Sequence, residues 1–262
     1  MKMTKSIILL SGGLDSVVSL AYIKFQGERG HEMPVANPIK FSAPLKGGMG
    51  GVQKNNISTF YNIQLALTFD YGQRAAKKEI EASKSISEYF NIEHKVIEVP
   101  WLKEITETSL VNTSQEIPQL KPGELDNLEA GLASAKNVWV PNRNGVFLNI
   151  AASFADAKDF THILFGANQE EGTTFPDNTQ EFIDKINESF EYSTLVKPKV
   201  FAPLINLNKT EIIKLALEIK APLHLVRSCY RDEEKHCGQC ESCMRLSRAL
   251  EANQKSFAEI GI

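Results

Sequence analysis

A short glycine loop after an apolar run near the N-terminus constrains this chain most. Residues 6–10 are continuously apolar apart from the first, the loop Ser11-Gly-Gly-Leu-Asp-Ser16 follows, and residues 17–25 are mostly apolar. A strand, a tight glycine turn and a helix in this order open an α/β fold. The unpaired N–H groups at the helix start would point at one place, so we predict an anion site there.

The loop matches neither common nucleotide-binding glycine motif. It lacks the lysine and spacing of a Walker A loop and the three-glycine spacing of a dinucleotide fingerprint. A carboxylate such as Asp15 repels phosphate unless Mg²⁺ or a helix N-terminus offsets its charge. We interpret the loop as a specific nucleotide site; the alternative is a plain turn in which Asp15 and Ser16 only cap the helix.

Strand and helix patterns alternate along the rest of the chain. Strands are expected at residues 63–69, 95–99 and 163–165, and helices at residues 80–90, 145–157, 181–192 and 208–219. The last helix begins with a capping box, Asn208 to Glu211. The alternation predicts an α/β fold with a mainly parallel sheet and helices on both faces.

Two segments lack such patterns. Residues 27–62 contain six glycines and three prolines and are interpreted as a mobile insertion, which either acts on access or docking or is an inert surface excursion. Residues 101–137 are polar and irregular and give little sign of a core.

All four cysteines are clustered near the C-terminus, at Cys229, Cys237, Cys240 and Cys243. A disulfide scaffold would spread cysteines across the fold, whereas a metal site clusters them. Four thiolates satisfy tetrahedral Zn²⁺ and leave no open position, so we predict structural zinc, with an iron–sulfur cluster as the alternative. The expected organisation is an α/β domain over residues 1–220 with a small zinc region, residues 221–262, packed on it.

Composition excludes several classes of protein. Apolar residues are 42% and charged residues 23% of the 262, which is ordinary for a globular chain. The net charge of -3 provides no excess of positive charge for nucleic acid or an anionic membrane. Because the N-terminal apolar run is too short for a signal peptide and no stretch approaches about 18 apolar residues, we expect a cytoplasmic protein without a membrane segment.

The glycine loop resembles the pyrophosphate loop of N-type ATP pyrophosphatases, which grips ATP while a substrate oxygen is adenylated and pyrophosphate leaves. Four more blocks make the chain similar to the 7-cyano-7-deazaguanine synthase (QueC) family. They are Thr68-Phe-Asp-Tyr-Gly-Gln-Arg74, Val140-Pro-Asn-Arg-Asn-Gly-Val-Phe147, Gly166-Ala-Asn-Gln-Glu-Glu-Gly-Thr-Thr-Phe-Pro-Asp177, and Ser228-Cys-Tyr230 with the cysteines after it. The resemblance implies a Rossmann-like, adenine nucleotide alpha hydrolase-like fold.

The resemblance also implies a reaction. ATP activates the carboxylate of 7-carboxy-7-deazaguanine, ammonia captures it as an amide, and a second activation dehydrates the amide to the nitrile of preQ0, a precursor of queuosine-type tRNA bases. Mg²⁺ with ATP, structural Zn²⁺ and a homodimer are expected. Sulfur transfer is disfavoured because metal occupies every cysteine.

Two other functions stay open at this point. A paralogue would pass the activated carboxylate to another amine, on a protein or other macromolecule docked by residues 27–62. A non-catalytic zinc-ribbon protein would bind nucleic acid, although acidic residues offset the basic ones around the cysteines.

The resemblance assigns roles to individual residues. ATP binding is assigned to Ser11, Gly12, Gly13, Leu14, Asp15, Ser16, Phe69, Asp70 and Gly166. Substrate binding is assigned to Tyr71, Gln73, Arg74, Asn144, Glu171, Thr173, Phe175 and Asp177. Catalysis is assigned to Asp15, Ser16, Arg143 and Lys209.

Several of these residues have a plain alternative. Arg143 pairs with a carboxylate or phosphate, or it anchors its own loop. Lys209 points at pyrophosphate or is simply solvated. Asp70 contacts nucleotide or ends its strand, and Tyr71 and Phe175 stack on a purine-like ring or pack in the core.

The block expected to bind the base departs from the family. Residues 171–178 read Glu-Gly-Thr-Thr-Phe-Pro-Asp-Asn, where the family usually has Asp-x-Ser-Gly-Tyr-Pro-Asp-Cys. With the long segment 27–62, this predicts a divergent member.

Overall fold

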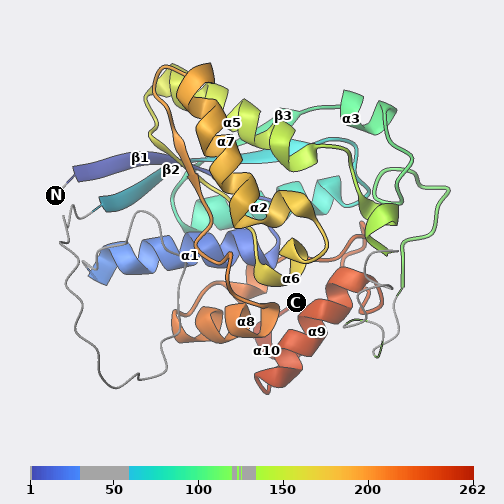
Figure 1. Ribbon diagram of the computed structural model, residues 1–262. Helices are drawn as coiled ribbons and strands as arrows, with labels where there is room; N and C mark the ends of the chain where they lie inside the picture. Colours follow the sequence, from blue (N-terminus) through green and yellow to red (C-terminus); the bar gives the residue numbers. More distant parts are fainter. Residues whose placement is uncertain (1, 30–58, 120–122, 124, 126–133) are drawn as a thin grey trace, which may run out of the picture.

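A parallel sheet forms the centre of the molecule (Figure 1). The computed structural model describes residues 2–29, 59–119, 123, 125 and 134–262. The strands are β1 (Lys2–Leu9), β2 (Thr59–Asp70), β3 (Glu93–Glu98), β4 (His162–Leu164) and β5 (Lys199–Phe201). Their order is β3-β2-β1-β4-β5 and every pairing is parallel, which confirms the predicted sheet. The short edge strand β5 was not predicted.

Helices cover both faces of the sheet, as predicted. The longer ones are α1 (Leu14–Arg29), α2 (Ala76–Tyr89), α5 (Arg143–Lys158), α7 (Gln180–Ser193), α8 (Lys209–Glu218) and α9 (Glu241–Ala252). The short ones are α3 (Trp101–Glu104), α6 (Gln169–Gly172) and α10 (Phe257–Ile260), with 3₁₀ turns at Pro176–Asn178 and Leu223–Leu225. None of these helices is long and apolar enough to span a membrane.

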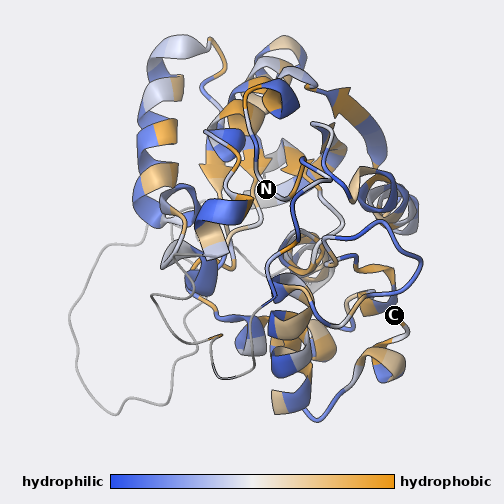
Figure 2. Cartoon of the chain, turned by 90° about the vertical axis from the view of Figure 1, so that its right-hand side faces the viewer, coloured by the Kyte–Doolittle hydropathy of each residue, from blue (hydrophilic) through white to orange (hydrophobic). Residues whose placement is uncertain are grey.

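The core has two layers, one on each side of the sheet. Ile7 and Leu9 of β1 face the layer under α5 and α7, whereas Ile8 and Leu10 face the layer under α1, α2 and α8. All four are buried, so the apolar run is continuous because the strand is covered on both faces. Figure 2 shows the hydrophobic residues gathered on the central strands and on the inner sides of the helices.

The C-terminal region packs on the second layer. Leu246 and Leu250 of α9 are buried in the same core cluster as Ile212 of α8. The predicted capping box of α8 is present, since the Asn208 side chain accepts from Glu211 N and the Glu211 side chain accepts from Asn208 N. The box fixes where α8 begins and therefore where Lys209 lies.

Both ends of the predicted insertion, residues 27–62, lie in regular elements. Residues 27–29 belong to α1 and residues 59–62 belong to β2; residues 30–58 lie outside the described part of the chain. Gly27 has a low helix propensity, but a single glycine does not end a helix that tertiary packing supports.

The expectation of little core in residues 101–137 was wrong. Leu102, Leu110 and Val111 are buried and join the core layer that also contains Leu148 of α5. They were missed because a single apolar residue in the four-residue helix α3 and two in the turns after it have no period to detect.

Leu102→Ala tests this contribution. Leu102 is fully buried, so the substitution should lower the free energy of unfolding by about 2–5 kcal/mol in urea denaturation. Ile105→Ala, at a side chain that is 58% exposed, is the neighbouring control and should change it by less than about 1 kcal/mol. Equal effects of the two would show that this segment does not belong to the core.

Candidate active site

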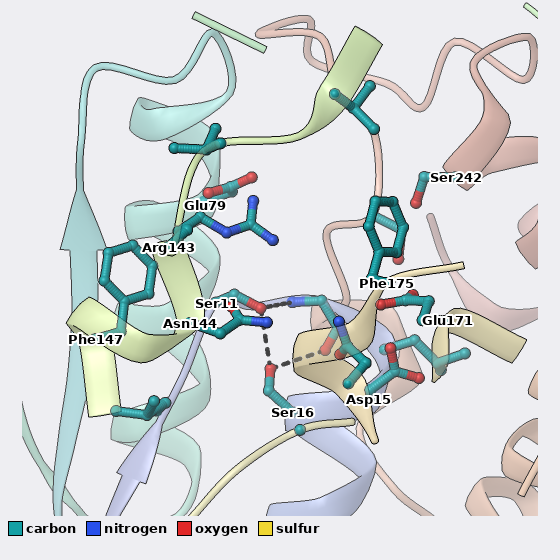
Figure 3. Close-up of a pocket in the computed structure, with 18 of the residues that line it drawn as sticks. Ser11, Asp15, Ser16, Glu79, Arg143, Asn144, Phe147, Glu171, Phe175 and Ser242 are labelled. Atoms are coloured by element: carbon teal, nitrogen blue, oxygen red, sulfur yellow. Dashed lines mark hydrogen bonds between the residues drawn. The ribbon is translucent and has the colours of Figure 1, made fainter. Parts of the chain in front are cut away.

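A cavity of about 260 Å³ opens where the carboxyl ends of β1, β2 and β4 meet (Figure 3). The strand order changes direction at β1, because β2 and β3 lie on one side of it and β4 and β5 on the other. In open parallel sheets, ligands bind outside the strand ends at such a switch point.

The glycine loop forms the floor of this cavity. Ser16 Oγ donates to the Gly13 carbonyl at 3.0 Å, and Gly13 N donates to Ser11 Oγ at 3.3 Å. Gly12 has a φ of +74°, and an added Cβ would lie 2.9 Å from Ala82 Cβ of α2. The loop therefore requires glycine at this turn, where it packs directly on α2.

The segment that follows β4 also lies close to the glycine loop. A Cβ added to Gly166 would lie 2.9 Å from Ser16 N, within the first turn of α1. The atoms that the added Cβ would meet belong to the backbone, so they cannot move aside as a flexible side chain could. Gly166 thus lets the β4 end reach the N-terminus of α1.

A buried ion-pair network joins the loop to two other segments. Lys209 Nζ lies 3.0 Å from Asp15 Oδ2 and 2.7 Å from Glu171 Oε1, and Asn168 Nδ2 donates to Asp15 Oδ2 at 3.1 Å. Lys209 is only 8% exposed, so the solvated alternative was wrong. Asp15 is held by α8 and by the residue before α6, so it does more than cap its own helix.

Burial and charge act against each other in this network. Burial disfavours the charged form of Lys209, but the carboxylates of Asp15 and Glu171 raise its pKa above the usual range. Burial raises the pKa of Asp15, and Glu171 adds to this while Lys209 opposes it. Asp15 Oδ1 is buried and has no hydrogen-bond partner within the described ranges. A buried carboxylate oxygen in that state calls for an additional donor or cation.

The opposite wall carries Arg143 at the start of α5. Arg143 donates from Nη1 to Tyr71 Oη at 3.1 Å, and its guanidinium lies 5.8 Å from the centre of the Tyr71 ring. It forms no ion pair with any described residue. A half-buried guanidinium without a carboxylate partner fits an anionic ligand.

Aromatic rings also line the cavity. Phe69 and Phe147 stack with centroids 4.0 Å apart, and Trp139 and Phe175 lie nearly parallel at 5.9 Å. Phe175 lies across the cavity from Arg143 in Figure 3. These flat apolar faces suit a planar heterocycle.

Comparison with known proteins identifies the family. The sequence model described as "Queuosine biosynthesis protein QueC" matches residues 50–254. A protein named 7-cyano-7-deazaguanine synthase from Methanosarcina barkeri is 46% identical over 94% of this chain and 93% of its own length. The chain belongs to the QueC family. Proteins of the same name from Pelotomaculum thermopropionicum and Carboxydothermus hydrogenoformans are each 44% identical, over 94% and 96% of this chain and 96% and 100% of their own lengths.

Most site residues predicted for this QueC-family chain lie around the cavity. They are Ser11, Gly13, Leu14, Asp15, Ser16, Phe69, Tyr71, Arg143, Asn144, Gly166, Glu171, Phe175, Asp177 and Lys209. They come from segments far apart in the sequence that share one edge of the sheet.

Five predicted residues do not line it. Gly12 turns away onto α2, and Asp70 Oδ1 accepts from Gly72 N within its own turn. Gln73 is buried against Phe69 O, Arg74 donates to the carbonyl oxygens of residues 112 and 115, and Thr173 Oγ1 donates to a carbonyl of α6. These contacts organise the loops around the site.

Some residues that line the cavity of this QueC-family chain were not predicted. Glu79 of α2, Glu170 of α6 and Arg245 of α9 line the cavity. Glu170 Oε2 lies 2.6 Å from Arg248 Nη2 and 3.4 Å from Arg245 Nη1. Glutamates and arginines on helices are usually solvated. Only the tertiary contacts distinguish these three cavity residues from glutamates and arginines on the surface.

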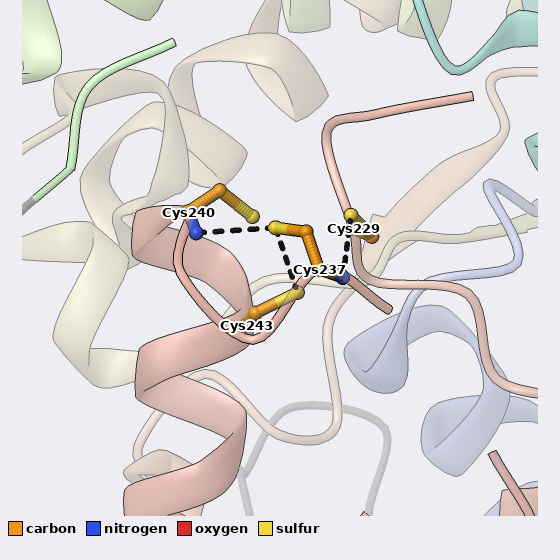
Figure 4. Close-up of side chains that lie close together, drawn as sticks. All are labelled: Cys229, Cys237, Cys240 and Cys243. Atoms are coloured by element: carbon orange, nitrogen blue, oxygen red, sulfur yellow. Dashed lines mark hydrogen bonds between the residues drawn. The ribbon is translucent and has the colours of Figure 1, made fainter. Parts of the chain in front are cut away.

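The four cysteines form one cluster (Figure 4). Their sulfur atoms all lie within 4.8 Å of one another, a donor set that can hold one metal ion. Backbone N–H groups of Arg231 and Cys240 donate to the sulfurs of Cys229 and Cys237 at 3.4 and 3.3 Å. Such bonds stabilise thiolates, the form that binds metal.

Gly166→Ala tests the close approach of β4 to the loop. Its Cβ would meet the Ser16 backbone, so we expect ATP affinity to fall about tenfold or more in isothermal titration, equivalent to about 1.4 kcal/mol. Gly27→Ala, with nothing within 4 Å of the added Cβ, is the matched control and should bind ATP as the wild type does. Unchanged affinity in Gly166→Ala would show that ATP does not use this end of α1.

Proposed function

We propose that this protein converts 7-carboxy-7-deazaguanine and ammonia to 7-cyano-7-deazaguanine at the expense of ATP. The single observation that carries the proposal is one cavity with a phosphate-type glycine loop at one side and, at the other, Arg143, which forms no ion pair with any described residue. Relatives named for this reaction align over nearly their whole length. This similarity favours nitrile formation over the amine-joining and nucleic-acid-binding alternatives.

ATP is proposed to bind with its phosphates on the glycine loop. The backbone N–H groups at the start of α1 and the hydroxyls of Ser11 and Ser16 supply donors to phosphate oxygens. Lys209 adds a positive charge that the surrounding carboxylates keep protonated. The adenine is proposed to lie against Phe69 at the end of β2.

Mg²⁺ fits the same side of the cavity. Asp15, Glu171 and Lys209 together carry a net charge of about -1 when ionised, so they repel a polyphosphate unless a cation is added. The unpartnered Asp15 Oδ1 is an oxygen ligand of the type that Mg²⁺ prefers. When bound, Mg²⁺ neutralises the charge that develops on departing pyrophosphate.

The deazaguanine carboxylate is proposed to pair with Arg143. Its planar ring then lies between the aromatic wall and Phe175, and Asn144 and Asp177 are available to its polar edges. Asn178, where the family has cysteine, donates to Asp177 Oδ1 at 3.2 Å. This contact orients the Asp177 carboxylate for recognition of N–H groups on the base.

The chemistry follows from this orientation. A carboxylate oxygen attacks the α-phosphorus of ATP and pyrophosphate leaves, held by the loop N–H groups and Lys209. Ammonia then displaces AMP to give the amide. A second ATP activates the amide oxygen, and loss of AMP and of the remaining N–H protons gives the nitrile. Holding both substrates in one cavity makes each attack effectively unimolecular.

The cysteine cluster is proposed to hold structural Zn²⁺. Four sulfur ligands leave no open coordination position, so the metal would fix the segment before α9 and take no part in the reaction. A homodimer stays the expected oligomeric form.

Direct assay tests the function. Protein supplied with 7-carboxy-7-deazaguanine, ATP, Mg²⁺ and ammonia should form the nitrile, detected by mass spectrometry. Asp15→Asn and Ser16→Ala should each lower turnover by at least about 10²-fold without loss of folding, because Asp15 is proposed to hold Mg²⁺ and Ser16 to donate to phosphate. Asp184→Asn, on the exposed side of α7, is the control. Normal turnover in both loop variants would remove the loop from the mechanism.

Metal analysis tests the zinc proposal. The protein should contain one Zn²⁺ per chain, and Cys240→Ser should lower metal content and thermal stability together, because binding free energy contributes to folding. Iron in place of zinc would support the cluster alternative. A fully stable protein with neither metal would contradict a structural metal site.

A further inference from the structure

Glu79 is a cavity carboxylate to which the reaction described above gives no role. We propose that Glu79 is the catalytic base that accepts the proton from ammonia when it attacks the acyl adenylate, a role that rests on the proposed function.

The side chain is held so that one oxygen stays available. Glu79 lies in the first turn of α2, and its Oε2 accepts from Gln73 Nε2 at 2.8 Å. Gln73 is itself fixed, because Nε2 also donates to Phe69 O at 3.1 Å and Oε1 accepts from Tyr71 N at 3.0 Å. Across the described residues, Glu79 Oε1 has neither a hydrogen-bond nor an ion-pair partner.

Glu79 lies where the substrate carboxylate is expected. In Figure 3 it is next to Arg143 on one side of the cavity, with Glu171 and Phe175 on the other. A carboxylate of the substrate paired with Arg143 would therefore present its reacting carbon close to Glu79. The backbone of Glu79 also contacts the glycine loop, since a Cβ on Gly12 would lie 3.2 Å from its carbonyl oxygen.

Four of the other cavity carboxylates are paired with cations, whereas Asp177 has no ion pair among the described residues and accepts from Asn178 Nδ2. Glu171 and Asp15 share Lys209, Glu170 pairs with Arg248, and Glu241 pairs with Arg245. Their charges are neutralised by cations within contact distance, which makes them poor proton acceptors.

Glu79 has cations near it but is not their ion-pair partner. Arg143 donates to Tyr71, and Arg227 donates to carbonyl oxygens of the loop after Cys229. Burial raises the pKa of Glu79, opposed by Gln73, Arg143 and Arg227. A carboxylate with a raised pKa is a stronger base, which is what proton transfer from nitrogen needs.

The step balances with Glu79 as acceptor. The ammonia lone pair forms the C–N bond at the acyl carbon, and the nitrogen gives one proton to Glu79 Oε1. The C–O bond to AMP breaks, and AMP leaves with its electron pair. The products are the amide, AMP and protonated Glu79, which then loses its proton to solvent.

Glu79→Gln separates this role from binding, because the amide keeps the shape and still accepts from Gln73. Adenylation is followed by substrate-dependent exchange of labelled pyrophosphate into ATP without ammonia. Exchange should stay within about threefold of wild type, while amide and nitrile formation with ammonia should fall at least about 10²-fold. Glu88→Gln, on the exposed side of the same helix, should behave as wild type.

Hydroxylamine provides a second readout. It is a stronger nucleophile than ammonia and depends less on base assistance, so Glu79→Gln should still form the hydroxamate at close to the wild-type rate. Glu79→Asp keeps a carboxylate and should recover part of the ammonia-dependent rate.

Other outcomes would overturn the proposal. Normal nitrile formation by Glu79→Gln would exclude a base at this position, and proportional loss of exchange, hydroxamate and nitrile would make Glu79 a binding or structural residue. Asp177→Asn is the comparison: if it alone kept exchange but lost aminolysis, Asp177 would be the base. A wild-type protein without nitrile formation would instead overturn the proposed function, and this role with it.

Discussion

The charged Lys209 side chain, buried between Asp15 and Glu171, is the interaction on which the arrangement of this site depends. Its two ion pairs, at 3.0 and 2.7 Å, tie the start of α8 to the loop after β1 and to α6. A buried charge that loses its partner costs about 3–5 kcal/mol, so these segments keep their relative positions as a set. A cation at a helix N-terminus is otherwise unfavourable, and the two carboxylates compensate for that location.

The same residues explain why the site suits a nucleotide. Two carboxylates and one ammonium leave a negative balance at a point where backbone N–H groups attract phosphate. Such a balance makes binding of a polyphosphate conditional on a cation, and the unpartnered Asp15 oxygen is available to that cation. The opposite side carries Arg143, which lies beside Glu79 but forms no ion pair with any described residue. In the proposed reaction, this cavity would bind phosphate through a cation and the anionic substrate directly.

The cysteine region is connected to this site through α9. Cys243 lies in the first turn of α9, and Arg245 and Arg248 of the same helix reach Glu170. Glu170 also accepts from Lys209 N at 2.8 Å, next to the side chain that holds Asp15. Fixing the cysteine segment therefore fixes the direction of α9 and, through Glu170, the base of the ion-pair network.

The sequence by itself determined the parallel sheet, the glycine loop, the α8 capping box and the cysteine cluster, because each depends on neighbours along the chain or on a short spacing. Its resemblance to the QueC family also indicated most residues of the cavity, which follow parallel strands that share one edge of the sheet. Tertiary structure alone decided which polar side chains face the cavity. Gln73 and Arg74 turn to the backbone around them, whereas Glu79, only a few residues later, lines the cavity beside Arg143. The physical reason is that the local sequence allows several rotamers and loop conformations at these positions. Hydrogen bonds and ion pairs between distant segments determine which of them is adopted.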